Sequence, residues 1–165
     1  MDNIHSIISS FKEYSSWIDT LKNVDDHIWK TPIAADKWSV REIIAHITNW
    51  DKYLLSDILP SIRRGEKISF PEFEPFNKIA SDYAKSGVTK QDILNEAKDT
   101  RELLVKELNE LPFETVTKHI LVNEVTHCPH TGTPYSLLYV VQEFIDHDRH
   151  HQKQVQQFAQ QNNLV

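Results

Sequence analysis

The fold is decided by one stretch near the end of the chain, Phe144-Ile145-Asp146-His147-Asp148-Arg149-His150-His151-Gln152-Lys153-Gln154. Apolar residues recur around it at the three- and four-residue spacing of a helix, namely Leu137, Val140, Phe144, Val155 and Phe158. At about 100° per residue, His147 and His151 fall on this apolar face and His150 on its flank. Two inward imidazoles four residues apart can bind one metal ion, but they can equally hydrogen-bond to another helix. A metal site therefore requires a third ligand.

The composition indicates a single all-α domain spanning residues 1–165. Glycine occurs 3 times, the 7 prolines cluster between periodic segments, and good helix formers abound. The single cysteine, Cys128, rules out an internal disulfide framework and is typical of a reducing compartment. We expect a cytoplasmic protein, because no signal peptide is visible and no apolar run approaches the ~20 residues of a membrane span. The formal net charge of -6 argues against nucleic acid as a partner.

Two helices are expected in the first half of the chain. The first runs from about Asn3 to Trp29, and Thr31-Pro32 marks its end. The second begins at a capping box, Ser39-Val40-Arg41-Glu42, in which the serine serves as N-cap and Glu42 reaches back to the N-cap amide. It ends near Pro60 or Gly65. The short connection between the two helices predicts that they are antiparallel neighbours.

Two further helices are expected in the second half. The periodic pattern breaks from Glu66 to Gly87, a long connection rich in proline and aromatic residues that allows the third helix to run parallel to the second. Thr89 can cap the third helix, and Pro112 stops it. Thr133 as N-cap and Pro134 at the first helical position open the fourth helix.

A second group of potential ligands precedes the fourth helix, at His127, Cys128 and His130. Its proline and glycine neighbours signal turns, so we interpret it as a loop, with zinc binding as the less favoured alternative. This loop could also lie at the mouth of the main site.

His46 is the best candidate for the third ligand, although it lies on the edge of the apolar stripe of its helix and periodicity alone fits a surface residue equally well. It is about 10 Å from the start of the second helix at 1.5 Å per residue. The pair formed by His147 and His151 is about 14 to 20 Å from the expected end of the last helix. If these two helices are antiparallel, the three imidazoles come to a similar height.

Two motifs carry a family resemblance: Lys37-Trp38-Ser39-Val40-Arg41-Glu42-Ile43-Ile44-Ala45-His46-Ile47 and His147-Asp148-Arg149-His150-His151-Gln152-Lys153-Gln154. Together they resemble the DinB-like superfamily, which includes YfiT-type metal-dependent hydrolases and thiol S-transferases. The resemblance implies a four-helix bundle with up-down-down-up topology and long connections between helices two and three and between helices three and four. It also implies a divalent metal ion held by three histidines, here His46, His147 and His151.

Such a site leads to two enzyme hypotheses. Three neutral imidazoles leave Zn²⁺ or Ni²⁺ with open positions, where the ion can lower the pKa of bound water or hold a thiol as thiolate. We expect a small-molecule transferase that uses a low-molecular-weight thiol as co-substrate, or a hydrolase. Glu143 and Asp148 are candidates for orienting a ligand or acting as the general base, unless they are only solvated carboxylates.

A non-catalytic alternative is a metal-stabilised bundle that serves as a stress-response or interaction module. The chain also has four Trp, and aromatic residues beyond those in the helical stripes, which makes a homodimer an expectation as well.

Overall fold

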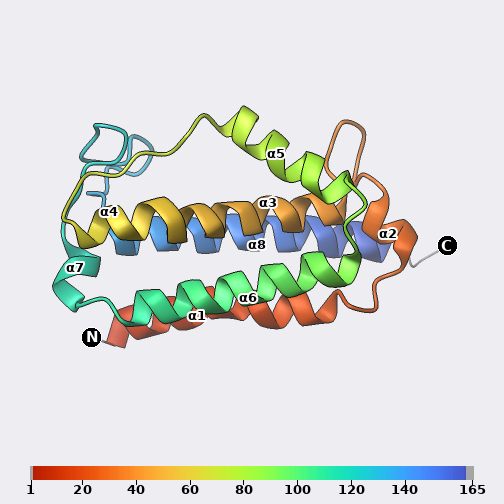
Figure 1. The fold of residues 1–165 in the computed structure, drawn as a ribbon, viewed down its shortest axis with the longest axis horizontal. Coiled ribbons are helices and arrows are strands. Elements are labelled where there is room, and N and C mark those ends of the chain that lie inside the picture. Colours follow the sequence, from red (N-terminus) through yellow and green to blue (C-terminus); the bar gives the residue numbers. More distant parts are fainter. Residues whose placement is uncertain (1, 163–165) are drawn as a thin grey trace.

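Four long helices form the body of the protein, whose computed structural model describes residues 2–162. They are α1 (Asp2–Thr20), α3 (Val40–Tyr53), α6 (Lys90–Asn109) and α8 (Leu137–Asn162). Figure 1 shows that α1 and α8 run in one direction along the bundle and that α3 and α6 run in the other. The prediction of an all-α four-helix bundle is confirmed for the described residues; residue 1 and residues 163–165 of the predicted domain lie outside them.

The predicted second helix continues past α3 through a wider turn. A π-helical segment, η1 (Leu54–Ile58), leads directly into α4 (Leu59–Arg63). In it the Leu59 amide donates to the Leu54 carbonyl oxygen, five residues back. Pro60 follows at once, and since proline has no N–H and crowds the preceding turn, a wide turn at this point allows the helix to continue. Gly65, with φ 71°, then ends it as predicted.

The prediction that the first helix runs on to Trp29 is wrong. The helix ends at Thr20, and a separate short helix, α2 (Asp26–Lys30), follows. The side chain of Asp25 accepts a hydrogen bond of 2.7 Å from the His27 amide, so it caps a new helix instead of continuing the old one.

The predicted start of the last helix is also wrong. Pro134 lies in a short antiparallel bridge with His127, outside the helix. The N-terminal groups of α8 are instead bound by Ser136, whose Oγ accepts from the Tyr139 amide at 3.1 Å and whose carbonyl accepts from the Val140 amide at 3.0 Å. The pairing of the preceding loop therefore takes Thr133 and Pro134 out of the helix.

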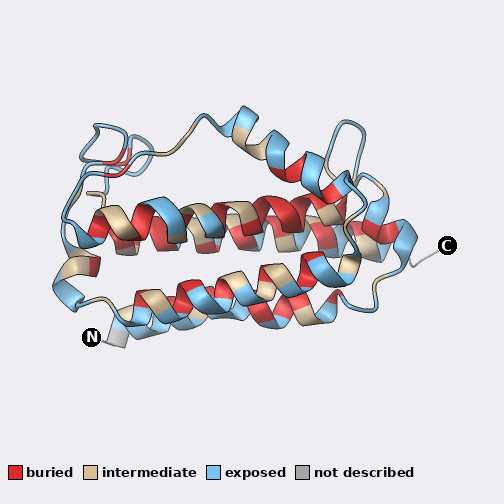
Figure 2. Ribbon diagram, in the orientation of Figure 1, coloured by how far each residue is buried: buried red, intermediate tan, exposed pale blue. Residues whose placement is uncertain are grey.

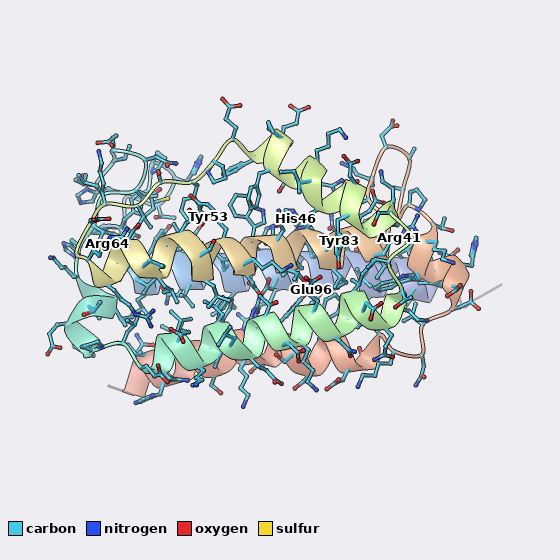
Figure 3. The ribbon with its side chains drawn as sticks, viewed as in Figure 1. Arg41, His46, Tyr53, Arg64, Tyr83 and Glu96 are labelled. Carbon is cyan, nitrogen blue, oxygen red and sulfur yellow. The ribbon has the colours of Figure 1, made fainter. Side chains whose placement is uncertain are left out.

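The two long connections cover one side of the bundle. The first carries α5 (Phe73–Lys85), which lies along α3 in Figure 1. The second carries a short helix, α7 (Phe113–Thr117), and then a loop that pairs with the first connection through hydrogen bonds of 3.0 Å between Ile68 and the residues Leu121 and Asn123. At the far end of α5, the Tyr83 hydroxyl donates to Glu96 of α6 at 2.9 Å (Figure 3). The third helix is capped at Thr89, as predicted, by a bond from the Asp92 amide.

The core consists of two apolar clusters with charged residues between them. One cluster contains Trp29 and the other contains Leu59. Figure 2 shows that buried residues recur along the long helices and alternate with exposed ones. Where the chain passes from one cluster to the other on α3, α6 and α8, a buried charged residue interrupts the apolar face, respectively Asp51, Arg101 and Asp148. No helix in residues 2–162 combines the length and the apolar character that crossing a membrane requires.

Candidate metal centre

Three histidines converge midway along the bundle. His46 of α3 and His147 and His151 of α8 offer nitrogen atoms that all lie within 4.8 Å of one another. The Nε2 atom of His147 lies 3.0 Å from Nε2 of His46 and 3.1 Å from Nε2 of His151. Figure 3 shows His46 near the middle of α3. The structure thus brings together the three residues that the sequence nominated as ligands.

The N-terminus of α3 is held rigidly, which fixes the position of His46. The carboxylate of Glu42 accepts hydrogen bonds from the amide of Ser39 at 3.0 Å and from its hydroxyl at 2.6 Å. Its other oxygen accepts from the hydroxyl of Ser81 on α5 at 2.6 Å. Just before the helix, the ring of Trp38 lies 4.6 Å from the ring of His46 and 6.4 Å from that of His151. The capping box therefore links α3 and α5, and Trp38 covers one side of the cluster.

The three imidazoles are suited to a divalent cation. Burial, followed by repulsion from neighbouring imidazoles, lowers the pKa of His46 to about 3 and that of His147 to about 4. Burial also lowers the pKa of His151. All three rings are therefore neutral at pH 7, which is the form that binds metal ions.

Hydrogen bonding gives a second reason to regard the three imidazoles as suited to a divalent cation. The Nδ1–H of His151 donates to the Gln154 side-chain oxygen at 2.9 Å, which leaves the Nε2 lone pair directed at the cluster. The Nε2 of His147 faces two other Nε2 atoms, and a neutral ring nitrogen can serve only one of them by a hydrogen bond. Zinc–nitrogen bonds of about 2.0 Å in a tetrahedral arrangement place ligand atoms about 3.3 Å apart, close to these separations. The donor set fits an ion such as Zn²⁺ or Ni²⁺.

A cavity of about 430 Å³ opens beside the histidines. His46 and His147 line it, and so does Glu143, one turn before His147 on α8. The remaining lining side chains are mostly apolar or aromatic and come from α3, α5, α8 and the two long connections: Trp50, Phe70, Phe73, Asn77, Val122, Asn123, Tyr135, Val140 and Phe144. Two of the three histidines and one carboxylate are thus accessible to a small molecule from the same side.

Asp148, the other carboxylate that the sequence nominated, lies in a different environment. It is buried in the core, and its Oδ2 accepts from Arg101 of α6 at 2.7 Å. The same guanidinium donates to both oxygens of Asp51 at 2.7 and 3.0 Å and to the Phe11 carbonyl of α1 at 2.9 Å. Arg101 also lies 3.8 Å from the ring centre of Phe11 and 4.2 Å from that of Tyr14. This network, which we call the Arg101 network, joins all four long helices.

Sequence reasoning did not find the Arg101 network, although a signal for it was present. Arg101 lies between Ala97 and Leu104 in the inward stripe of its helix, where a charged residue requires a buried partner. Burial raises the pKa of Asp51, and burial together with repulsion from Asp51 raises that of Asp148 to about 7, although the Arg101 guanidinium opposes both shifts.

The loop with Cys128 is separate from the three-histidine cluster. His127 and His130 are exposed, and the His127 ring hydrogen-bonds to its neighbour Thr126 at 2.8 Å. Cys128 is buried, and hydrogen bonds from Tyr139 and then from Thr131 lower the pKa of its thiol to about 6. His150 is exposed, in agreement with its predicted place on the flank.

The bundle and its histidine cluster define the protein as an all-α four-helix-bundle protein with a candidate three-histidine metal centre. The model of the DinB superfamily matches residues 12–155, and the chain therefore belongs to this superfamily, as its motifs predicted.

Among solved structures, the chain is similar to YfiT from Bacillus subtilis, which is described as a probable metal-dependent hydrolase with an unusual four-helix bundle topology. The two are 14% identical, and the match covers 99% of this chain and 89% of that chain with a TM-score of 0.76. At this identity the likeness shows the fold. No curated protein matches the chain.

Proposed function

We propose that this chain is a divalent-metal-dependent enzyme that acts on small molecules, with His46, His147 and His151 as the ligands of Zn²⁺ or Ni²⁺. The observation that carries the proposal is the convergence of three neutral imidazoles beside an open cavity that two of them line. Among the described residues the cluster has three protein ligands, which is the number typical of catalytic sites and lower than that of closed structural sites. The description of YfiT supports the same class of activity.

A divalent ion held by three neutral imidazoles supplies Lewis-acid chemistry, which favours the deprotonated form of a thiol or water at neutral pH. Gln154 keeps the Nδ1 proton of His151 in place, so that the Nε2 lone pair stays available. Glu143 is the carboxylate that lines the cavity, and it is suited either to accepting the proton of the nucleophile or to contacting the substrate. Asp148 is committed to Arg101, so its contribution is to hold α8 in position.

Thiol S-transfer is the first candidate reaction, because a cavity with a mostly apolar lining favours the binding of an apolar electrophile. The thiol loses its proton to Glu143 or to solvent, and its sulfur forms a bond to an electrophilic carbon. The bond from that carbon to the leaving group breaks, and the leaving group departs with the bonding electrons. Hydrolysis is the second candidate, favoured by the description of YfiT, and water replaces the thiol in the same sequence of bond changes.

Turnover assays with and without chelator test this proposal. Purified protein is incubated with glutathione or bacillithiol and 1-chloro-2,4-dinitrobenzene, and in parallel with 4-nitrophenyl acetate and no thiol. Chelator-sensitive conjugation supports the transferase, and chelator-sensitive ester cleavage without thiol supports the hydrolase. If metal binds but neither substrate class is turned over, the non-catalytic module is the better account.

A further inference from the structure

We propose that the cavity beside the histidines selects aromatic molecules, with Phe73 and Glu143 as its specificity-determining residues: Phe73 favours aromatic ligands, and Glu143 disfavours anions in the metal-free protein. The proposal rests on the proposed function in one respect, namely that this cavity is the substrate site. A volume of about 430 Å³ lies within the range of small-molecule sites, which is roughly 300 to 1,000 Å³.

An aromatic wall is the main feature of the cavity. The ring of Trp50 lies 5.6 Å from that of Phe73, 6.0 Å from that of Phe70 and 6.4 Å from that of Phe144, and all of these residues line the cavity. Aromatic pairs are favourable at centroid separations of about 4.5 to 7 Å. A flat aromatic ligand in the cavity would continue the packing that these rings already make with one another.

The indole N–H of Trp50 already has a hydrogen-bond partner and does not require one from the ligand. This N–H donates to the Asn77 side-chain oxygen at 3.0 Å, so the ring needs no further hydrogen-bond partner. The cavity therefore offers the indole as an apolar surface.

Phe73 leaves an unusually large apolar surface in water. It is the first residue of α5 and lines the cavity, yet 64% of its surface is exposed. A ligand that packs against it removes this surface from water, at a gain of free energy proportional to the area covered. Phe73 therefore contributes to binding more than to folding, whereas Trp50, only 7% exposed, contributes to both.

In the metal-free protein, the side-chain charge of the cavity disfavours anions. Glu143 is the only acidic residue of the lining, and neither lysine nor arginine is among the described residues that form it. Glu143 also has no ion-pair partner in the described part of the chain. An anionic ligand would meet this carboxylate with no cationic side chain of the lining to offset the repulsion.

Binding of matched probes to metal-free protein tests the proposal without requiring turnover. The probes are 2-naphthol, its saturated analogue 2-decalol and the anion 2-naphthalenesulfonate, and affinities are measured by calorimetry in the presence of chelator. We expect 2-naphthol to bind at least about threefold more tightly than 2-decalol, as aromatic packing is worth about two- to tenfold. We expect it to bind at least about fivefold more tightly than the sulfonate.

Two variants test whether Phe73 and Glu143 determine these differences in affinity. Phe73→Ala should weaken 2-naphthol binding at least about fivefold, whereas the control Phe113→Ala should leave it unchanged, because Phe113 is also exposed, at 46%, but is not part of the cavity. Glu143→Gln should raise the affinity for the sulfonate toward that for 2-naphthol without changing the latter.

The proposal is overturned if the sulfonate or 2-decalol binds as tightly as 2-naphthol, or if the two Phe variants behave alike. Circular dichroism confirms that each variant is folded. A negative result in these binding measurements does not affect the turnover assays that test the metal-dependent activity. Conversely, a protein that binds no metal would show the same affinities for these probes, so the two proposals fail separately.

Discussion

Replacing Arg101 by Met should destabilise the protein strongly. The substitution introduces an apolar side chain of similar length. It removes four hydrogen bonds, to Asp51, Asp148 and the Phe11 carbonyl, and leaves two buried carboxyl groups without a cation. Breaking a buried ion pair by removing one partner costs about 3 to 5 kcal/mol. For a domain of this size each kcal/mol lowers the melting temperature by roughly 2 to 4 °C, so we expect a decrease of about 6 to 20 °C.

Urea and thermal unfolding measure this effect, and Arg63→Met is the matched control. Arg63 forms an exposed ion pair with Glu107, so its loss should cost at most about 1 kcal/mol. Adding Asp51→Asn and Asp148→Asn to Arg101→Met should recover part of the stability, since neutral amides replace the unpaired carboxylates. A loss below about 1 kcal/mol in Arg101→Met, equal to that of the control, would refute the view that this network joins the four helices.

Three further predictions concern the metal centre and its support. Because the pKa values of His46 and His147 are about 3 and about 4, below the ordinary value of a histidine, protons compete with the metal only in acid. The pKa of His151 is also lowered, so the metal affinity, measured by chelator competition, should begin to decline only below pH 6.5, and a steep decline that starts at or above pH 6.5 would contradict this. Gln154→Leu should weaken metal binding about 10- to 100-fold, because the His151 ring loses the acceptor that orients it; an unchanged affinity in the same competition assay would contradict that role. Glu42→Ala should lower the free energy of unfolding by about 2 to 3 kcal/mol in urea titrations, because buried donors at the start of α3 lose their acceptor, and a change within about 0.5 kcal/mol would show that water replaces it.

Helical periodicity was sufficient to identify two of the three candidate ligands. His147 and His151 share the apolar face of one helix, so their spacing alone places them together and leaves His150 outside. His46 is 101 residues from His147 in the sequence, and its position depends on how α3 packs against α8. Its height along the helix made His46 a candidate for the third ligand, but the family resemblance was needed to decide between this role and that of a surface residue.

The remaining features depend on contacts between distant segments. Ser136 caps α8 because the preceding loop pairs His127 with Pro134, and the local pattern of Thr133-Pro134 gives no sign of that pairing. Arg101 likewise finds its partners 47 and 50 residues away. A single inward charge on one helix predicts that a partner exists without saying which residue it is.

The metal content of the protein tests the central claim most directly. Wild-type protein, the His147→Ala variant and the His150→Ala control are dialysed against Zn²⁺ or Ni²⁺ under native conditions and analysed by plasma mass spectrometry. His150 is the matched control because it adjoins His151 in the sequence but is exposed and outside the cluster. We predict about one ion per chain in the wild type and in His150→Ala, and almost none in His147→Ala. A wild type that retains no divalent ion, or a His147→Ala variant with unchanged stoichiometry, would contradict the account.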